Sequence, residues 1–304
     1  LADLNQCSRE YKSRMYDGEV KGLSVVKPFM GVRADTPSDA TVMRVRYESD
    51  RGIVLSEGIH PWLSDLDTYA MTVSVVDEAV RRAVAAGARP DRIALLDNFC
   101  WPDPVESEKT PDGAYKMAQL VRSNRALYDL CTAWGTPLIS GKDSMKNDST
   151  RGGRKISIPP TLLISALGQI DDVRGAVTNP FKQAGDAIFV AGWTKDETGA
   201  SAWARSLAAD AGTPPACGGR APGVDPASAW RRFEAVHRAA ETGVLRSATA
   251  PARGGLVLAL AMGCLGGACG ADIDLSALPV EGELDDAVRL FSMFAAPPEQ
   301  SLEW

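Results

Sequence analysis

Apolar positions recur along the chain with two different periods, and the change of period separates strands from helices. Residues 41–47 alternate apolar and polar side chains, as a half-buried strand does. From 67 to 86 the apolar residues fall at three- and four-residue steps and Gly87 follows, which predicts a helix with a glycine stop. The same criteria predict a helix at 113–134 and strands at 52–56, 92–96, 137–140 and 156–167.

A turn-rich stretch at 171–185 interrupts this pattern, and a second set of elements follows it. Because strands and helices alternate on both sides of the break, the chain is predicted to hold two α/β or α+β domains. Their expected bounds are 39–171 and 172–304, with residues 1–38 as an arm or linker. In the second domain we expect strands at 187–191 and 271–275, helices at 200–209, 227–242 and 254–265, and a Gly/Pro-rich loop at 212–226.

Composition and charge narrow the classes of protein. The 304 residues suffice for two cores, and the net charge of −6 comes from interspersed acidic and basic residues without the basic stripe of a nucleic-acid-binding protein. No apolar run is long enough to cross a membrane. Six scattered cysteines, none in a Cys-x-x-Cys pair, predict free thiols in a reducing cytoplasm and no zinc site. Since the sequence starts at Leu1, we expect a piece of a longer protein or a processed one.

The first candidate for chemistry is Asp97, directly after the predicted strand at 92–96. A carboxylate that follows a buried strand lies at the rim of a sheet, where the ligands of α/β proteins gather. Asp97 could hold Mg²⁺, because this ion prefers oxygen ligands and bridges carboxylates to phosphates. The alternative is that Asp97 only caps the following turn.

The second candidate is the segment 139–144, with the sequence Ile-Ser-Gly-Lys-Asp-Ser, again at the end of a predicted strand. Gly141 lets a phosphate approach the backbone, Lys142 supplies a point charge and Ser144 adds a hydroxyl. The spacing is not that of a Walker A loop, and an ordinary strand-to-loop turn explains the segment equally well on its own. Two such segments at neighbouring strand ends favour a ligand site more than either does alone.

Beyond these two segments, the chain carries an ordered set of motifs that covers nearly its whole length. They include residues 94–101, 135–144, 156–166, 254–256 and 270–275. Together they resemble the second half of the synthetase region of phosphoribosylformylglycinamidine synthase, within the aminoimidazole ribonucleotide synthetase-like superfamily. The resemblance implies a two-domain half, with an N-terminal domain that contributes to a shared β-barrel and a flanking C-terminal α/β domain.

The resemblance also implies an activity. Enzymes of this family use ATP to phosphorylate the amide oxygen of formylglycinamide ribonucleotide, and ammonia from a glutaminase domain or subunit then displaces the phosphate. The implied partners are the other synthetase half, in a homodimer or an intramolecular pseudo-dimer, and the implied cofactors are ATP and Mg²⁺. Asp97, Gly141 and Lys142 would face the nucleotide, with Asp97 on the metal, and Ser144 would face the substrate.

One stretch departs from the family pattern. Where members show His-Asp-x-Ser-Asp/Glu-Gly-Gly, residues 249–255 read Thr-Ala-Pro-Ala-Arg-Gly-Gly. Ala250 and Ala252 cannot ligate, and Arg253 reverses a charge. We therefore expect a truncated or degenerate C-terminal domain, an altered wall opposite Asp97 in the nucleotide pocket, and no activity of the chain alone.

Two alternatives stay open on the sequence. One is a non-catalytic half that binds a structural nucleotide, or none, and scaffolds its partner half. The other is a sister enzyme of the superfamily, such as aminoimidazole ribonucleotide synthetase or selenophosphate synthetase. The combination at 95–101 and 140–144 favours the amidine-forming branch, and Cys7 lacks the surroundings of a selenophosphate synthetase cysteine.

Overall fold

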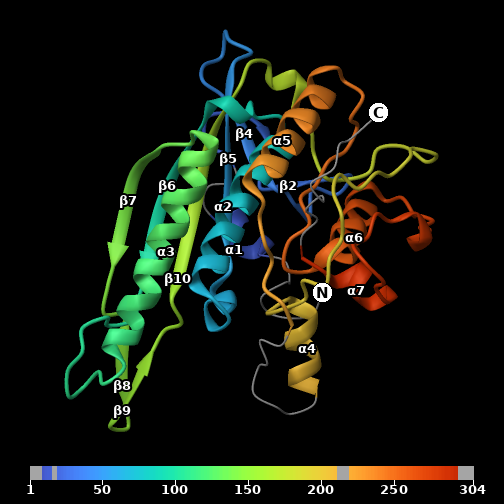
Figure 1. Ribbon diagram of the computed structural model, residues 1–304. Coiled ribbons are helices and arrows are strands. Elements are labelled where there is room, and N and C mark those ends of the chain that lie inside the picture. Colours follow the sequence, from blue (N-terminus) through green and yellow to red (C-terminus); the bar gives the residue numbers. More distant parts are fainter. Residues whose placement is uncertain (1–8, 16–18, 211–218, 294–304) are drawn as a thin grey trace.

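A six-stranded mixed sheet organises the first part of the chain in the computed structural model, which describes residues 9–15, 19–210 and 219–293. Neighbouring strands of the sheet run antiparallel, except for the last two, which are parallel (Figure 1). In spatial order the strands are β1 (Ser24–Val26), β4 (Ala40–Arg44), β5 (Gly52–Ile59), β10 (Thr161–Ile170), β6 (Ile93–Cys100) and β7 (Leu138–Ser144).

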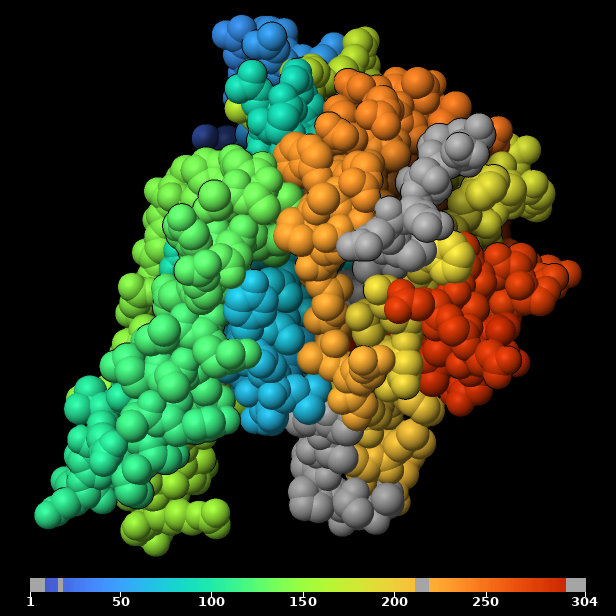
Figure 2. Space-filling view, viewed as in Figure 1, coloured from blue at the N-terminus to red at the C-terminus, as the bar shows by residue number. Residues whose placement is uncertain are grey.

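Helices cover one face of this sheet, which we call the helix face. Helix α2 (Thr68–Ala85) packs on β5 and β10, and α3 (Gly113–Trp134) packs beside it. The Asp67 carboxylate begins α2 by accepting hydrogen bonds from two backbone N–H groups, and Gly135 ends α3 in the left-handed conformation with φ 64°. Helix α5 (Pro226–Glu241) packs against α2 and α3, and part of α2 shows as a blue area between the green of α3 and the orange of α5 (Figure 2).

We call the opposite face of the sheet the open face, because none of the described helices α2, α3 and α5 packs on it. Side chains alternate along β5, so that Val54 is fully buried on the helix face while Leu55 is 44% exposed. Met43 on β4 and Leu96 on β6 are also more than a third exposed. The sheet therefore has an apolar open face and, within the described residues, two unpaired edges, at β1 and β7.

The remaining elements are short or belong to the second part of the chain. Two hairpins, β2–β3 and β8–β9, stand apart from the main sheet, and the second projects beyond it (Figure 1). These elements are α1 (Glu10–Met15), β2 (Phe29–Met30), β3 (Thr36–Pro37), β8 (Asp148–Arg151), β9 (Arg154–Ser157), α4 (Ala202–Asp210), α6 (Gly255–Gly267) and α7 (Asp286–Phe291), with 3₁₀ turns at Pro61–Asp65, Pro90–Arg92, Val173–Gly175 and Leu275–Ala277.

All five predicted helices are present, three of them within a residue or so of the expected bounds. The predicted strand at 156–167 divides in two, because Pro159 and Pro160 interrupt the ladder between β9 and β10. The strands expected at 187–191 and 271–275 are wrong: neither segment is a strand. A strand needs a partner backbone, and the described residues after 171 form isolated bridges in place of ladders, such as the bridge between Thr194 and Val280.

The predicted division of the chain at 38 and 171 stays a prediction. β1 lies within the stretch expected to be an arm and pairs with β4. Most of the Gly/Pro-rich loop expected at 212–226 lies outside the described residues, and α5 begins at Pro226. No helix among the described residues has the length and apolar character that a membrane span requires.

The close contact between β5 and α2 depends on Gly58. A Cβ atom at this position would lie 2.0 Å from the carbonyl oxygen of Val75 on α2. We predict that Gly58→Ala lowers the free energy of unfolding by about 3 kcal/mol, the upper end of typical overpacking costs. Chemical denaturation measures this, with Gly175→Ala as control, since a Cβ at Gly175 meets no atom within 4 Å. Equal stability of the two variants would contradict the packing described.

Candidate active site

Asp97 lies within a strand and not after one, which corrects the prediction. β6 continues through Asp97 to Cys100, so the carboxylate projects from the middle of the strand. The strand continues because β10 and β7 pair with it on both sides, at Ile164 and Gly141 respectively. A single-sequence pattern shows where apolar residues stop but not where pairing stops.

The segment 139–144 is also not a turn. It forms most of β7, which pairs in parallel with β6, and no other described strand pairs with the outer edge of β7. Gly141 stands beside Asp97, and a Cβ at Gly141 would lie 2.8 Å from Asp97 Oδ1. The glycine therefore makes room for the carboxylate, a role that differs from the phosphate approach expected of it.

Asp97 and Gly141 lie on the helix face, whereas Lys142 and Ser144 lie on the open face. Alternation along β7 places Lys142 beside Asn98 and Ser144 beside Cys100. The Ser144 hydroxyl is within 3.1 Å of the Asn147 side-chain oxygen, and Lys142 is exposed. The four predicted site residues thus cluster along two adjacent strands but project from both faces of the sheet.

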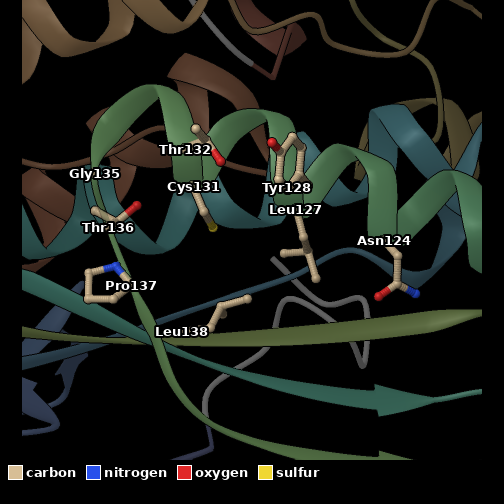
Figure 3. Close-up of a pocket in the computed structure, with 9 residues that line it drawn as sticks. All are labelled: Asn124, Leu127, Tyr128, Cys131, Thr132, Gly135, Thr136, Pro137 and Leu138. Carbon is tan, nitrogen blue, oxygen red and sulfur yellow. The ribbon is translucent and has the colours of Figure 1, made fainter.

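A groove opens between α3 and the start of β7, with a volume of about 500 Å³ (Figure 3). Leu127 and Cys131 point from α3 towards the strand that carries Leu138. The groove is mainly apolar with a few hydroxyl, amide and thiol groups. Its lining is Asn124, Leu127, Tyr128, Cys131, Thr132, Gly135, Thr136, Pro137 and Leu138.

The charge of Asp97 acts on Cys131, one of the residues that line this groove. Burial raises the pKa of Asp97, and the negative charge of Asp143 raises it further, against the effect of a backbone hydrogen bond. Burial also raises the pKa of the Cys131 thiol, and the charge of Asp97 contributes in the same direction. The thiol is therefore a poor nucleophile. Any cation or hydrogen-bond donor that reaches Asp97 stabilises the charged form of its carboxylate.

The 249–253 loop does not form a wall opposite Asp97 in this chain. The Ala250 N–H donates to the Asp39 carboxylate at 2.9 Å, just before β4. Strands β5 and β10 lie between β4 and β6, which separates the two places by roughly 14 Å at the usual strand spacing. The single chain thus places the loop and Asp97 apart, and the expectation of one pocket with a changed wall stays a prediction.

Sequence reasoning missed a group of buried charges on α2. Asp77 pairs with Arg81 at 3.1 Å and Glu78 with Arg82 at 2.7 Å, and both acids are almost fully buried. The signal was available, because two acids followed four residues later by two arginines interrupt an otherwise apolar helix. His60 was missed too: burial lowers its pKa to about 3, and the charges of Arg253 and Arg205 lower it further.

Comparison with known families identifies the two parts of the chain. Residues 37–170 match the AIR synthase related protein N-terminal domain, and residues 183–299 match the AIR synthase related protein C-terminal domain. The chain belongs to the AIR synthase related proteins. The resemblance drawn from the motifs is thereby confirmed at the level of the family, as is the two-domain fold class.

Among the relatives of this AIR synthase related chain are phosphoribosylformylglycinamidine synthase subunits PurL. The subunit of Thermoplasma acidophilum is 32% identical over 91% of the chain, and that of Methanocaldococcus jannaschii is 30% identical over 96%. The chain spans only about a third of each relative, 34% and 37% respectively.

Solved structures agree on the fold. T. maritima PurL complexed with AMPPCP aligns with a TM-score of 0.53 over 80% of this chain and 32% of its own, at 22% identity. The HypE–HypF complex aligns with a TM-score of 0.58 over 94% of this chain and 80% of its own, at 16% identity. At these identities the likeness shows the fold alone.

The raised pKa of Asp97 has a measurable consequence. Since the folded-state pKa lies above the unfolded value, ionisation of Asp97 opposes folding as the pH rises through the folded-state pKa. We predict that Asp97→Asn raises the melting temperature at pH 7 and that this gain disappears below about pH 4, near the ordinary pKa of aspartate.

Thermal unfolding across this pH range measures the effect, with Asp272→Asn at an exposed position as the control. A fall in melting temperature at pH 7 would show that the Asp97 carboxylate accepts a stabilising bond in the folded chain.

Proposed function

We propose that the chain forms one half of the synthetase region of a phosphoribosylformylglycinamidine synthase, corresponding to its second half. The observation that carries the proposal is the similarity to PurL subunits along almost the whole chain. T. maritima PurL has been solved in complex with AMPPCP, with ADP and with FGAR, which supports a nucleotide and a ribonucleotide as ligands of proteins with this fold. The thiols and the family together support a cytoplasmic enzyme.

The reaction is a carbon–nitrogen ligation with ammonia derived from glutamine. ATP phosphorylates the amide oxygen of formylglycinamide ribonucleotide, since phosphate is a far better leaving group than oxide, and ammonia then replaces it. Most of the help that a protein gives to such a transfer is positioning and charge neutralisation. The glutaminase that supplies ammonia is a separate domain or subunit.

Lys142 and Ser144 are the residues of this chain that we assign to ligands. Both are on the open face at β7, where Lys142 is exposed and offers a cation to phosphate oxygens. Ser144 stands two residues further along β7, beside Cys100, where its hydroxyl reaches the substrate. Asn98 and Lys142 would then contact the nucleotide together from adjacent strands.

Asp97 fits Mg²⁺ only as a single ligand. No group of three His, Cys, Asp or Glu side chains among the described residues is arranged to hold a metal ion. Asp97 lies beside Gly141 on the helix face, whereas Lys142 lies on the open face, so a metal ion on Asp97 would be separated by the sheet from phosphates at Lys142. Water and groups of the other half would have to supply the remaining ligands of such an ion, and its charge would neutralise Asp97.

The other synthetase half is the partner that the open face requires. Met43, Leu55 and Leu96 are exposed apolar side chains on β4, β5 and β6, and they extend across the open face of the sheet. A second half that brings its own sheet to this face closes a shared barrel, either within one polypeptide or between two copies. Because Lys142 and Ser144 lie on the same face, the ligand site is complete only in that assembly, and the chain alone is inactive.

Nucleotide use can be tested in the assembled enzyme. We predict that Lys142→Ala raises the KM for ATP about tenfold, the effect of losing one charge-assisted hydrogen bond of about 1.4 kcal/mol. Lys109→Ala, at an exposed lysine of the 102–112 loop, is the matched control and leaves the KM unchanged. Steady-state formation of formylglycinamidine ribonucleotide gives the readout.

If Asp97→Ala and Lys142→Ala both leave turnover and the KM for ATP unchanged, these residues have no part in the reaction. The chain would then act as a non-catalytic scaffold for the other half.

The proposed interface makes a second prediction. Leu55→Glu places a charge in the middle of the open face and should weaken association with the other half by at least tenfold. Val121→Glu introduces the same charge at an exposed position of α3, on the other side of the sheet, and should leave association unchanged. Analytical ultracentrifugation of the mixed halves distinguishes them, and equal effects would place the interface elsewhere.

A further inference from the structure

The side-chain amide of Asn147 closes the end of the β6–β7 pair, just after Ser144. Its Nδ2 lies 2.6 Å from the Ser144 carbonyl oxygen and 3.2 Å from the Trp101 carbonyl oxygen. The backbone adds to these contacts, because the Asn147 N–H donates to the Trp101 carbonyl at 2.9 Å and the Trp101 N–H donates to the Ser144 carbonyl at 2.8 Å. Trp101 is fully buried, so the Asn147 side chain is held against the core of the first domain.

These contacts fix the direction in which the Asn147 amide points. A side-chain NH2 group donates and a carbonyl oxygen only accepts, so the group that faces two backbone carbonyls must be the NH2. The other end of the amide, Oδ1, is then the atom that lies 3.1 Å from the Ser144 hydroxyl. Since Oδ1 can only accept, the Ser144 hydroxyl donates its single hydrogen to Asn147.

This bond leaves Ser144 Oγ with lone pairs and no hydrogen for a ligand. The side chain is half-buried, and within the described part of the chain its bond to Asn147 is the one hydrogen bond that Oγ makes. If the hydrogen turned towards a ligand instead, Asn147 Oδ1 would lose its donor, which opposes that rotation. The hydroxyl is therefore prepared to accept a hydrogen bond.

We propose that Asn147 is a positioning residue that makes Ser144 a hydrogen-bond acceptor, so that Ser144 recognises a donor group of the substrate. The inference rests on the proposed function, which places the substrate at Ser144. The donors of formylglycinamide ribonucleotide are its ribose hydroxyls and its amide N–H groups. Its phosphate is excluded, because ionised phosphate oxygens only accept.

Lys142 and Ser144 then differ in polarity along the same strand. Both project from the open face of β7, where Lys142 stands beside Asn98 and Ser144 beside Cys100. The Lys142 ammonium donates and attracts phosphate oxygens, whereas the Ser144 hydroxyl accepts and leaves them unbound. The pair therefore sets the direction of the ligands, with phosphate groups towards Lys142 and a donor group towards Ser144.

The assembled enzyme provides the test, with the KM for each substrate as the readout. Ser144→Ala should raise the KM for formylglycinamide ribonucleotide about fivefold, the effect of one neutral hydrogen bond, and leave the KM for ATP unchanged. Asn147→Ala should raise the same KM about twofold, because the hydroxyl is then free to rotate. The double variant should match Ser144→Ala. Ser149→Ala, at an exposed serine of β8, is the matched control and should change neither KM.

Substrate analogues identify the group that Ser144 contacts. One set lacks a single ribose hydroxyl, a second is N-methylated at one amide, and a third lacks the phosphate. An analogue of the first or second set should raise the KM of the unsubstituted enzyme about fivefold without a further rise in Ser144→Ala, and its set tells ribose from amide. Loss of the phosphate should raise the KM of both enzymes by the same factor.

The inference is overturned if Asn147→Ala lowers the KM for formylglycinamide ribonucleotide or leaves it unchanged. It is also overturned if loss of the phosphate affects the unsubstituted enzyme more than Ser144→Ala, since Ser144 would then donate to phosphate. The proposed function survives both of these results. If Ser144→Ala changes neither KM, the placement of the substrate at Ser144 is itself wrong and the inference fails with it. Should Asn147→Ala not fold, the analogues with Ser144→Ala decide.

Discussion

The distance between α2 and the sheet is the constraint on which the rest of the fold depends. Gly58 lets the backbone of β5 approach the Val75 carbonyl, so α2 sits close to the sheet at this point, with no room for a side chain at position 58. A helix at this depth buries almost all of its surface, including two acids that solvent would otherwise stabilise. The arginines on the same helix, and the packing of α3 and α5 over it, follow from that burial.

The helices were predictable because the residues that begin, space and end a helix lie within or next to the helix itself. The three- and four-residue spacing of apolar positions at 67–86 and the glycine after Trp134 are local signals, and the structure uses both. Strands depend on neighbours that the local sequence does not reveal. β6 and β7 therefore extend past their apolar residues into Asp97 and Lys142, and 187–191 forms no strand despite its apolar run.

The candidate site was predictable in part for the same reason. The sequence placed Asp97 and Gly141 near each other, and the parallel register of β6 and β7 makes them neighbours. It could not place Lys142 on the opposite face, because the alternation of side chains matters only once the segment is known to be a strand. Nor could it separate the 249–253 loop from Asp97, since that separation results from the insertion of β10 between β5 and β6.

The free edge of β7 has a consequence for how this chain selects its neighbours. An unpaired strand attracts any other strand, and identical chains present identical edges at high local concentration during synthesis. Lys142 and Asp143 stand in the middle of this edge and carry opposite charges on opposite faces. A strand that pairs here must accommodate both charges at once, so Lys142 and Asp143 discriminate between a matching strand and an accidental one.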